Sequence, residues 1–361
     1  MVAAYRGEYV GPKCLLDPGR TTDACRRRPG LYNCGFKKPP IYPPMRILLV
    51  KTSSLGDVIH NLPVLNDIRR HFPEAVIDWC VEESFAAIPR LHPAVDKIIP
   101  VAIRRWRRNL FQARTWREIG ICRQALQGER YAAVIDTQGL LKSAYLASRA
   151  HGPCAGYAAD SIREPLAAGL YERRFSVSRD LHAVVRNRQL VAAALGYELA
   201  GQPDYGIAVP PAAFDWLPTK PYVVLLTATS RDDKLWPEEH WLALGQALHA
   251  QGLRAVLPGG TQVERDRAAR LAAGIPDAVA APPLFIPDLA AVLAGATAAV
   301  GVDTGLTHLA VALKVPSIAL YTATDPGLTG VLGAGFFRNL GGKAQIPEVS
   351  AVLAELQAAL A

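Results

Sequence analysis

The sequence predicts an α/β protein with two domains, each a parallel sheet covered by helices. Strand-like and helical segments alternate from residue 45 to the C-terminus, which is typical of parallel sheets. The length of 361 residues exceeds what one hydrophobic core usually serves. A proline-rich stretch at residues 201–221 interrupts the alternation near its middle and is typical of a linker. We therefore expect domains at residues 45–205 and 206–346, followed by a helix at residues 347–361.

The first strand and helix enclose a short polar loop. Residues 46–51 form an apolar, strand-like run, and residues 57–70 carry apolar side chains at helical spacing. In open parallel sheets the loop between them lies at the carboxyl edge, where ligands bind. Asp57 is the only acid at this loop, and we predict that it acts as a catalytic base. The alternative interpretation is an acid that stabilises a helix N-terminus, and both can hold together.

Further strands of the first domain are expected at residues 75–81, 97–101 and 131–136, with helices at residues 109–126, 140–149 and 181–195. In the second domain, strands are expected at residues 222–227, 254–257, 298–302 and 317–321, with helices at residues 238–251, 262–273 and 304–313. The loops after these strands are the places to search for a site.

Charge and cysteine content argue against several classes of protein. The formal net charge is +8, but residues 1–44 hold eight Lys/Arg and three Asp/Glu, so this leader supplies most of it. The remainder lacks the basic surface typical of nucleic-acid binding. The six cysteines form no CxxC pair, and Cys80 and Cys122 are expected as buried free thiols in a reduced, cytoplasmic protein. No apolar run reaches the ~18 residues of a membrane span.

The leader itself, residues 1–44, is rich in Pro, Gly and Arg and has no apolar period. We expect it to be disordered or to precede the true start, because Met45 is the second of only two methionines and directly precedes the first strand. It lacks the apolar segment of a secretory signal.

The sharpest candidate site is the motif VGVDTGLTH in the second domain. A buried strand ends at its acid, and a helix begins with the residues Thr304, Gly305 and Leu306. The N–H groups and dipole of such a helix start predict a diphosphate pocket, and glycine permits close approach of the phosphate. The alternative is a capped turn, with Asp303 as N-cap and His308 as a packed histidine.

Two more loops of the second domain carry suitable side chains. The motif TSRDDKLW offers the hydroxyls of Thr229 and Ser230, and Lys234 would neutralise charge on a departing diphosphate. Part of this stretch is ordinary helix capping before Pro237. The motif GGTQVE ends in Glu264, which we predict accepts hydrogen bonds from sugar hydroxyls. Three such loops on one sheet edge favour a nucleotide.

The first domain carries basic candidates for a second, anionic ligand. The motif IRRWRRN follows a strand and places four guanidinium groups around Trp106, namely Arg104, Arg105, Arg107 and Arg108. This pattern predicts an anion site or, equally, a solvated helix start. The loop DTQGLLKS places Lys142 where a helix N-terminus can hold an anion, or it is simply a turn.

These motifs, in order along both domains and together with SIREPLA, closely resemble those of the heptosyltransferase I enzymes of lipopolysaccharide synthesis, within glycosyltransferase family 9. The resemblance covers residue 45 to the C-terminus. It implies a GT-B fold, in which two Rossmann-like domains face each other across a cleft. It also implies transfer of L-glycero-D-manno-heptose from ADP-heptose to Kdo2-lipid A in the inner core, with inversion at the anomeric carbon.

The resemblance also implies roles for single residues. Asp57 matches the catalytic base, and Lys234 assists departure of the diphosphate. The donor would be held by Thr229, Ser230, Lys234, Glu264, Asp303, Thr304, Gly305, Leu306 and His308. The anionic acceptor would be received by Arg104, Arg105, Arg107, Arg108, Lys142 and Arg163.

No metal or other cofactor is expected, because Lys234 and helix N-termini would act where other glycosyltransferases use a divalent ion. The expected partners are ADP-heptose, Kdo2-lipid A and the cytoplasmic face of the inner membrane. Alternatives are heptosyltransferase II, another GT-B sugar-nucleotide transferase, or a nucleotide-binding protein without catalysis. A dehydrogenase is disfavoured, because no GxGxxG follows an early strand.

Overall fold

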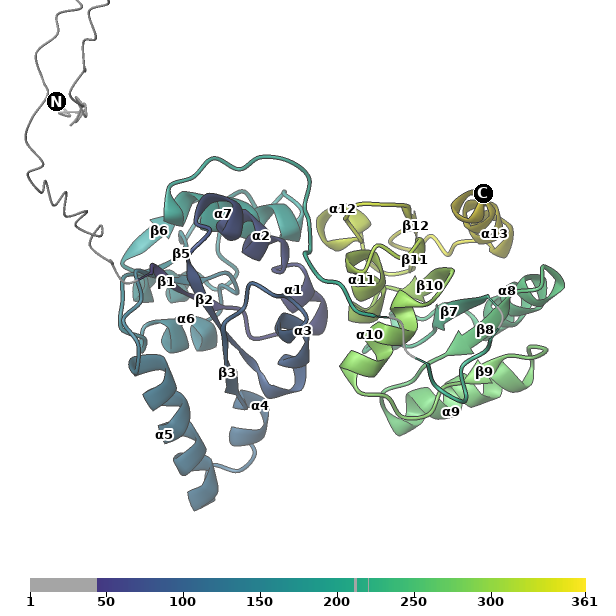
Figure 1. The fold of residues 1–361 in the computed structure, drawn as a ribbon, viewed down its shortest axis with the longest axis horizontal. Coiled ribbons are helices and arrows are strands. Elements are labelled where there is room, and N and C mark those ends of the chain that lie inside the picture. Colours follow the sequence, from purple (N-terminus) through teal and green to yellow (C-terminus); the bar gives the residue numbers. More distant parts are fainter. Residues whose placement is uncertain (1–43, 211–212, 220) are drawn as a thin grey trace, which may run out of the picture. The chain divides into compact units, whose positions relative to one another are not determined.

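The computed structural model describes residues 44–210, 213–219 and 221–361. The expectation for the leader falls almost wholly on residues 1–43, which lie outside this range. The described chain forms two domains, each with a six-stranded parallel sheet, coloured purple to teal and green to yellow in Figure 1. The predicted two-domain α/β class is confirmed. None of the described helices has the length and hydropathy needed to span a membrane.

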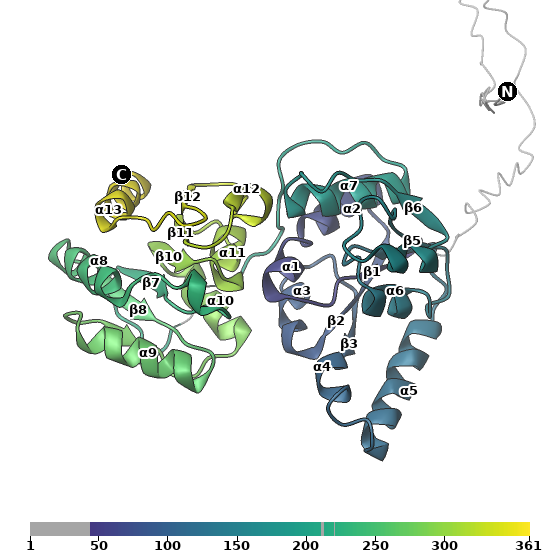
Figure 2. The same cartoon turned by 180° about the vertical axis from the view of Figure 1, so that it is seen from behind.

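The first sheet has the strand order β3-β2-β1-β4-β5-β6. Its strands are β1 (Arg46–Val50), β2 (Val76–Glu82), β3 (Lys97–Val101), β4 (Ala133–Asp136), β5 (Cys154–Tyr157) and β6 (Arg173–Phe175). Its helices are α1 (Leu55–Ile59), α2 (Pro63–His71), α3 (Ala87–Arg90), α4 (Ile103–Trp106), α5 (Ala113–Gln127), α6 (Leu141–Ala147) and α7 (Ala183–Leu195), with short 3₁₀ helices η1 (Glu83–Phe85) and η2 (Pro165–Leu170). Figures 1 and 2 show α2 and α7 on one side of the strands and α6 on the other.

The second sheet has the order β12-β11-β10-β7-β8-β9. Its strands are β7 (Tyr222–Leu226), β8 (Arg254–Leu257), β9 (Val279–Ala280), β10 (Ala298–Val302), β11 (Ser317–Tyr321) and β12 (Phe337–Gly341). Its helices are α8 (Glu238–Ala250), α9 (Gln262–Ala273), α10 (Ile286–Ala294), α11 (Gly305–Ala312), α12 (Pro326–Thr329) and α13 (Val349–Leu360), with the 3₁₀ helix η3 (Asp232–Lys234).

Both faces of the second sheet are buried, as expected for a parallel sheet. Along β7, Val223 and Leu225 pack into one apolar cluster with α8, α9 and α13, whereas Val224 and Leu226 face the cluster that contains α10 and α11. The final helix belongs to the first of these clusters through Val352. It is therefore part of the core of the second domain.

The two sheets share one topology. Counted within its own domain, each sheet has the order 3-2-1-4-5-6. The first three strands therefore extend the sheet to one side and the next three to the other, and this change of side falls between β1 and β4 and again between β7 and β10. Ligands of doubly wound sheets bind at the carboxyl ends of the strands beside this change of side. The loops after β1, β4, β7 and β10 are therefore where this fold predicts a site.

One predicted element differs from the structure close to the site. The helix expected at residues 57–70 is two helices, α1 and α2, separated at His60–Leu62 with Pro63 at the first position of α2. Proline lacks an N–H and its ring clashes with the carbonyl four residues earlier, so α1 ends at Ile59. The prediction of one continuous helix was wrong.

The predicted buried free thiols are confirmed for Cys80 and Cys122, and Cys154 is a third. Burial raises the pKa of Cys80 well above its ordinary value and that of Cys122 to about 11. These thiols are therefore protonated and fill space in the core.

Candidate active site

The site begins at Asp57, which lies in the first turn of α1. Its Oδ2 accepts hydrogen bonds from the backbone N–H of Ser54 at 2.7 Å and from the Ser54 hydroxyl at 3.0 Å. The interpretation of Asp57 as a helix-capping acid is thereby confirmed. Its second oxygen, Oδ1, makes no hydrogen bond within the described part of the chain. The carboxylate lines a cavity of about 660 Å³.

Hydrogen bonds to the loop after β4 hold the loop that carries Asp57 in place. The side-chain oxygen of Gln138, after β4, accepts the backbone N–H groups of Thr52 at 3.1 Å and Ser53 at 3.0 Å. Buried Lys51 donates to the carbonyl of Thr137 at 2.8 Å. Burial lowers the pKa of this ammonium, while the carboxylate of Asp57 partly opposes the shift. The loops after β1 and β4 are thus joined where the first sheet changes side.

Across the cavity, the loop after β10 presents Asp303 and the start of α11. Oδ2 of Asp303 accepts hydrogen bonds from the Lys234 ammonium at 2.8 Å and from the Thr324 hydroxyl at 2.7 Å. The hydroxyl of Thr229 donates to the Asp303 carbonyl at 2.9 Å. The N-cap of α11 is Thr304, so the alternative interpretation of Asp303 as the N-cap was wrong. Its carboxylate holds Lys234 instead.

The N-termini of α1 and α11 approach each other closely at Gly305. A Cβ placed on this glycine would lie 2.7 Å from Cγ of Leu55, which is closer than carbon atoms pack. Only glycine therefore fits here without displacing α1. The first N–H groups of a helix have no partner within it, so the start of α11 supplies donors beside the cavity.

Glu264 caps α9 and also borders the site. Its Oε2 accepts the backbone N–H groups of Gly260 at 2.8 Å and Thr261 at 2.9 Å. The residue lines the main cavity and an adjoining cavity of about 250 Å³. The smaller cavity has apolar walls from the end of β7, the loop after β8 and α10, which include Leu226, Pro258 and Leu289.

Three histidines lie between the domains. Nε2 of His60, after α1, lies 3.1 Å from Nδ1 of His308 on α11, and the ring of His182 lies 5.6 Å from that of His60. Burial, with the neighbouring histidines, lowers the pKa of His60 well below its ordinary value. Burial lowers the pKa of His308 to about 4. Both rings are therefore neutral near pH 7, and one donates a hydrogen bond to the other across the domain boundary.

The predicted donor residues are brought together. Thr229, Ser230, Lys234, Glu264, Asp303, Thr304, Gly305 and His308 line the same cavity as Asp57, and Leu306 lines the smaller cavity beside it. These donor residues come from three separate loops and the helices that follow them.

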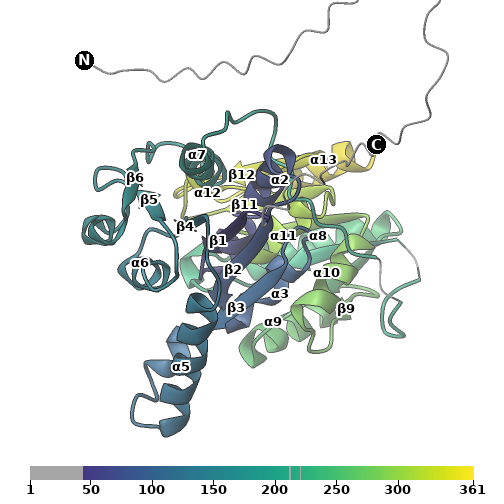
Figure 3. The ribbon, with the colours of Figure 1, turned by 60° about the vertical axis from the view of Figure 1, so that its left-hand side comes forward.

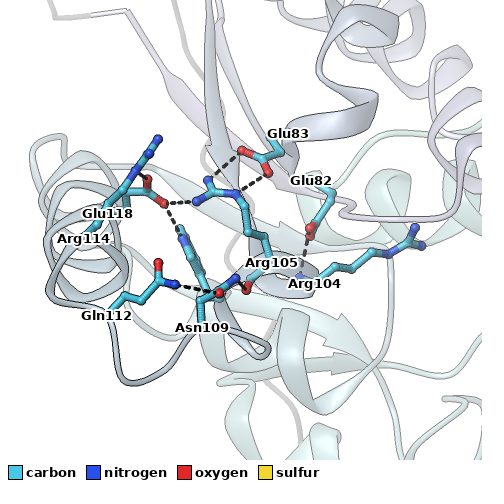
Figure 4. Close-up of polar contacts among 9 residues, drawn as sticks. Glu82, Glu83, Arg104, Arg105, Asn109, Gln112, Arg114 and Glu118 are labelled. Carbon is cyan, nitrogen blue, oxygen red and sulfur yellow. Dashed lines mark hydrogen bonds and ion pairs between the residues drawn. The ribbon is translucent and has the colours of Figure 1, made fainter.

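The predicted acceptor residues are only partly brought together. Arg104 lines the main cavity. Arg105 is bound by carboxylates, with ion pairs to Glu83 at 3.0 Å and Glu118 at 2.7 Å, and Figure 4 shows the Arg104 side chain pointing away from this group. The remaining predicted cations, which are exposed or half-buried, do not line the main cavity: Arg107, Arg108, Lys142 and Arg163.

Some residues at the site were not predicted, namely Ser54, His60, Phe85, Thr261, Thr324 and Thr329. A serine three residues before an acid is a capping signature, so the spacing of Ser54 and Asp57 carried a signal. Thr324 follows β11 at the same sheet edge. No local pattern marks His60, because its partner lies 248 residues further along the chain.

Comparison with known proteins identifies a family and similar structures. Residues 119–351 match the family described as glycosyltransferase family 9 (heptosyltransferase). The lipopolysaccharide heptosyltransferase 1 of Pseudomonas aeruginosa is 51% identical over 292 residues, which cover 80% of this chain and 82% of that protein. The E. coli heptosyltransferase WaaC with ADP has a TM-score of 0.80 at 45% identity, covering 87% of this chain and 100% of the other. WaaC with ADP-2-deoxy-2-fluoro heptose has a TM-score of 0.78 at 43% identity, covering 87% and 99%.

Proposed function

This chain belongs to glycosyltransferase family 9, the heptosyltransferases, and from that membership we propose that it transfers L-glycero-D-manno-heptose from ADP-heptose to Kdo2-lipid A in the lipopolysaccharide inner core. Similarity to lipopolysaccharide heptosyltransferase 1 over 80% of the chain supports the reaction class. Similarity to WaaC structures with ADP and with a fluorinated ADP-heptose supports the donor.

One observation carries the proposal at the level of chemistry. Asp57, a carboxylate with one oxygen fixed and one without a partner among the described residues, shares a cavity with Lys234 and the N-terminus of α11. The first group is suited to accept a proton, and the others are suited to hold negative charge. Glycosyl transfer with inversion needs these two functions on opposite sides of the anomeric carbon.

The reaction follows from this arrangement. The acceptor hydroxyl attacks the anomeric carbon from the side of Asp57, and its oxygen forms the new C–O bond. The bond from the anomeric carbon to the β-phosphate oxygen breaks, and its electron pair leaves with ADP. The hydroxyl proton passes to the Asp57 carboxylate. The anomeric configuration is inverted, because entry and departure occur on opposite faces.

We assign the parts of the donor to the two cavities. The adenine fits the smaller, apolar cavity of about 250 Å³, and Glu264 at the boundary is placed to accept hydroxyl groups of the ribose. The diphosphate then reaches the start of α11 and Lys234. Because Lys234 already bonds Asp303, the carboxylate holds the ammonium extended toward the cavity before the donor arrives.

We further propose that no divalent ion is needed. Asp303, the acid that follows β10, is already ion-paired with Lys234 at 2.8 Å. Fixed positive charge at this position stabilises the departing diphosphate. Turnover measured in EDTA should equal turnover in Mg²⁺. Loss of activity in EDTA that Mg²⁺ restores would contradict this proposal.

The acceptor is an amphipathic lipid, so we place the reaction at the cytoplasmic face of the inner membrane. Arg104 is the acceptor-side cation that lines the main cavity, and it faces the region where the acidic Kdo sugar would enter. Exposed Arg107 and Arg108 lie beside it in the sequence and would meet anionic headgroups.

A heptose-transfer assay with two acceptors tests the proposal. ADP-heptose is incubated with Kdo2-lipid A or with the same lipid already carrying one heptose, and ADP release and product mass are followed. We expect transfer to the first acceptor alone. Transfer to the second alone would assign the chain to the heptosyltransferase II reaction, and transfer to neither would overturn the proposed function.

A further inference from the structure

The connection between α4 and α5 projects from the first domain. In Figures 1 and 3 the start of α5 and the loop that leads to it extend away from the strands of this domain. We call residues 107–117 the tip. No residue of the tip lines the cavity of Asp57 or the smaller cavity beside it. The tip is therefore a surface outside the site described above.

Three large apolar side chains of the tip face solvent. Phe111 is 105% exposed, Trp116 is 60% exposed and Leu110 is 46% exposed. A phenylalanine with this exposure contributes nothing to the core of its own domain. Exposed apolar side chains in one group mark an interaction surface more often than scattered ones do. The tip therefore has apolar surface that a partner would cover.

Hydrogen bonds hold the tip in a fixed shape. The indole N–H of Trp116 donates to the Leu110 carbonyl at 2.8 Å, which closes the loop onto α5. The side-chain amide of Gln112 donates to the Asn109 side chain at 3.0 Å, and that of Asn109 donates to the Arg105 carbonyl at 3.0 Å (Figure 4). An ordered loop loses little conformational entropy when its apolar side chains are covered, which favours binding.

Positive charge is concentrated at the tip and the residues that flank it. Residues 103–124 contain seven arginines and one glutamate, a net charge of +6. Residues 1–44 account for +5 of the total of +8, so residues 45–361 carry +3, and those outside 103–124 carry +3 minus +6, or −3. Arg107, Arg108 and Arg117 are exposed and form no ion pair with a described residue. This asymmetry favours an anionic partner.

The combination of exposed aromatic rings and arginines is complementary to the surface of an anionic lipid bilayer. Aromatic side chains favour the boundary between headgroups and acyl chains. Arginines are attracted to anionic headgroups. A bilayer thus covers the apolar side chains and pairs the cations at once.

The tip is joined to the active site through α4. Arg107, where the tip begins, is the C-cap of this helix, and Arg104 of the same helix lines the cavity of Asp57. Contact of the tip with a bilayer therefore brings this cavity close to the membrane surface, where an amphipathic acceptor is found.

We propose that the tip docks the protein on an anionic bilayer, where Phe111 and Trp116 enter the boundary between headgroups and acyl chains. The exposed arginines of the tip then contact lipid phosphate groups. The inference rests on the proposed function for its membrane location and deepens it by naming the surface that meets the lipid. The acyl chains of the acceptor stay in the bilayer.

Co-sedimentation with vesicles tests this surface. The full chain is mixed with vesicles of phosphatidylcholine, alone or with phosphatidylglycerol, in the absence of donor and acceptor. The proteins are the wild type, Phe111→Ser, the double variant Arg107→Gln/Arg117→Gln and the matched control Phe285→Ser. Phe285 of the second domain is 81% exposed, so the control removes the same ring from another surface.

We expect the wild type to bind the vesicles with phosphatidylglycerol at least ~10-fold more tightly than those without it. Phe111→Ser should lower the partition coefficient on the anionic vesicles ~10-fold, because a buried ring is lost. The double variant should lower it ~5-fold for each charge removed. Phe285→Ser should bind as the wild type does. Melting temperatures should agree within ~2 °C, because the changed side chains are exposed.

The depth of insertion is measured through Trp116. Vesicles with brominated acyl chains should quench part of the tryptophan fluorescence of the wild type. Trp116→Phe keeps an aromatic ring and should still bind, but its remaining tryptophans should be quenched less.

Several results would overturn the docking surface. Equal binding by the wild type, Phe111→Ser and the double variant would assign the membrane contact elsewhere, for example to the basic residues 1–44. Absence of binding by the wild type, equal loss in Phe285→Ser, or quenching that Trp116→Phe leaves unchanged would reject it as well. A wild-type dimer that Phe111→Ser converts to a monomer would assign the tip to a second copy of the chain. None of these measurements involves heptose transfer, so the assay with two acceptors tests the proposed function separately.

Discussion

The carboxylate of Asp57 divides its two oxygens between two tasks. Oδ2 accepts two hydrogen bonds from Ser54, which fix the orientation of the group and cap α1. Oδ1 has no hydrogen-bond partner in the described residues, and the carboxylate lines a cavity. A base that is already oriented needs no reorganisation when the acceptor hydroxyl arrives. The structural and the catalytic interpretations of this residue therefore support each other.

Asp57→Asn should separate these two tasks. The amide oxygen still accepts the N–H of Ser54, so we expect the melting temperature to stay within about 2 °C of wild type. The variant cannot take the hydroxyl proton, so kcat should fall ~10²–10⁴-fold while donor binding is kept. Steady-state kinetics and titration with ADP measure the two effects. Glu239→Gln, in the first turn of α8, is the matched control and should keep full activity.

Lys234 supplies charge to the donor while Asp303 holds it in place. Lys234→Met should lower kcat/KM for ADP-heptose by roughly 10- to 100-fold, because a charged hydrogen bond is worth about 1.5–3 kcal/mol. The same change leaves the Asp303 carboxylate without its cation and lowers stability, so the electrostatic loss has to be separated from the structural one.

The double variant Lys234→Met/Asp303→Asn makes that separation. Removal of both charges should restore the melting temperature, because no unpaired carboxylate remains beside Thr324. The rate should stay low, because the diphosphate still lacks its ammonium. Recovery of both stability and rate in the double variant would show that Lys234 acts only on Asp303.

At the scale of the helix, Pro63 determines the length of α1, the helix that carries Asp57. It limits α1 to five residues, so α1 does not continue in line with α2. Pro63 was a sequence signal for this break, but the prediction of one helix at residues 57–70 did not take it into account. Apolar spacing alone does not reveal a break when Val58, Leu62 and Leu65 keep helical spacing across it.

Four strands were not predicted. One of them, β5, is a buried four-residue strand inside the first sheet, and the other three share a physical cause. β6, β9 and β12 are sheet edges, and their side chains are largely exposed or half-buried. Without burial on both faces they lack the continuous apolar runs that identified β1, β7 and β10. Strands β8, β10 and β11, which are buried inside the sheet, were predicted with their observed bounds. The edge strand β3 was also predicted with its observed bounds, through its apolar residues Ile98, Ile99 and Val101.

The site was predictable where it follows the strand-end rule. Asp57 and Asp303 each come shortly after a buried central strand, so pattern alone brought them to a sheet edge. The ion pair of Lys234 with Asp303 spans 69 residues, and that of Arg105 with Glu83 spans 22. Such pairs depend on which loops lie close together in the folded protein. The local periodicity of the sequence carries no information about this.

The contact between α1 and α11 gives a prediction at the scale of elements. Gly305→Ala would place Cβ 2.7 Å from Cγ of Leu55 and push the two helix starts apart. We expect a cost of about 1–3 kcal/mol and a clear fall in kcat/KM, measured by thermal melting and kinetics. Cβ of Leu55 also lies 2.8 Å from the added Cβ, so only Leu55→Gly/Gly305→Ala removes every clashing atom, and it should recover activity relative to Gly305→Ala.

A glycine with free space around it provides the control. A Cβ added at Gly120 on α5 would meet no heavy atom of the described chain within 4 Å, so Gly120→Ala should be neutral or stabilising. Normal activity in Gly305→Ala would show that α1 moves away without consequence and that the close approach is not needed.

At the scale of the molecule, the two domains meet through apolar and neutral polar contacts at the site. One apolar cluster includes both the core of the first domain and the α10–α11 side of the second sheet. Beside it, His60 and His308 share a hydrogen bond, and Nε2 of His182 donates to the Gly330 carbonyl at 2.9 Å. The donor loops and Asp57 are therefore held opposite each other by contacts that depend on uncharged histidines.

This dependence predicts the response of the protein to acid. The pKa of His308 is lowered to about 4 by burial, whereas an unfolded histidine titrates near 6.5. Between these values the unfolded chain binds more protons, so the free energy of unfolding falls as the pH drops from about 6.5 toward 4. The stabilisation is fully present above about pH 6.5. The nearby cation Lys234 and the carboxylates Asp57 and Asp303 oppose one another in this shift.

We expect the wild type to lose several degrees of melting temperature between pH 7 and pH 5, at about 2–4 °C per kcal/mol. His308→Asn retains a polar atom near the position of Nδ1 but cannot be protonated, so its melting temperature should change less over the same interval. His151→Asn, at an exposed histidine, should keep the wild-type slope. If His308→Asn and the wild type lose stability in parallel, the acid response arises from groups elsewhere, such as His92, whose pKa burial also lowers to about 4, and the histidine contact between the domains does not set it.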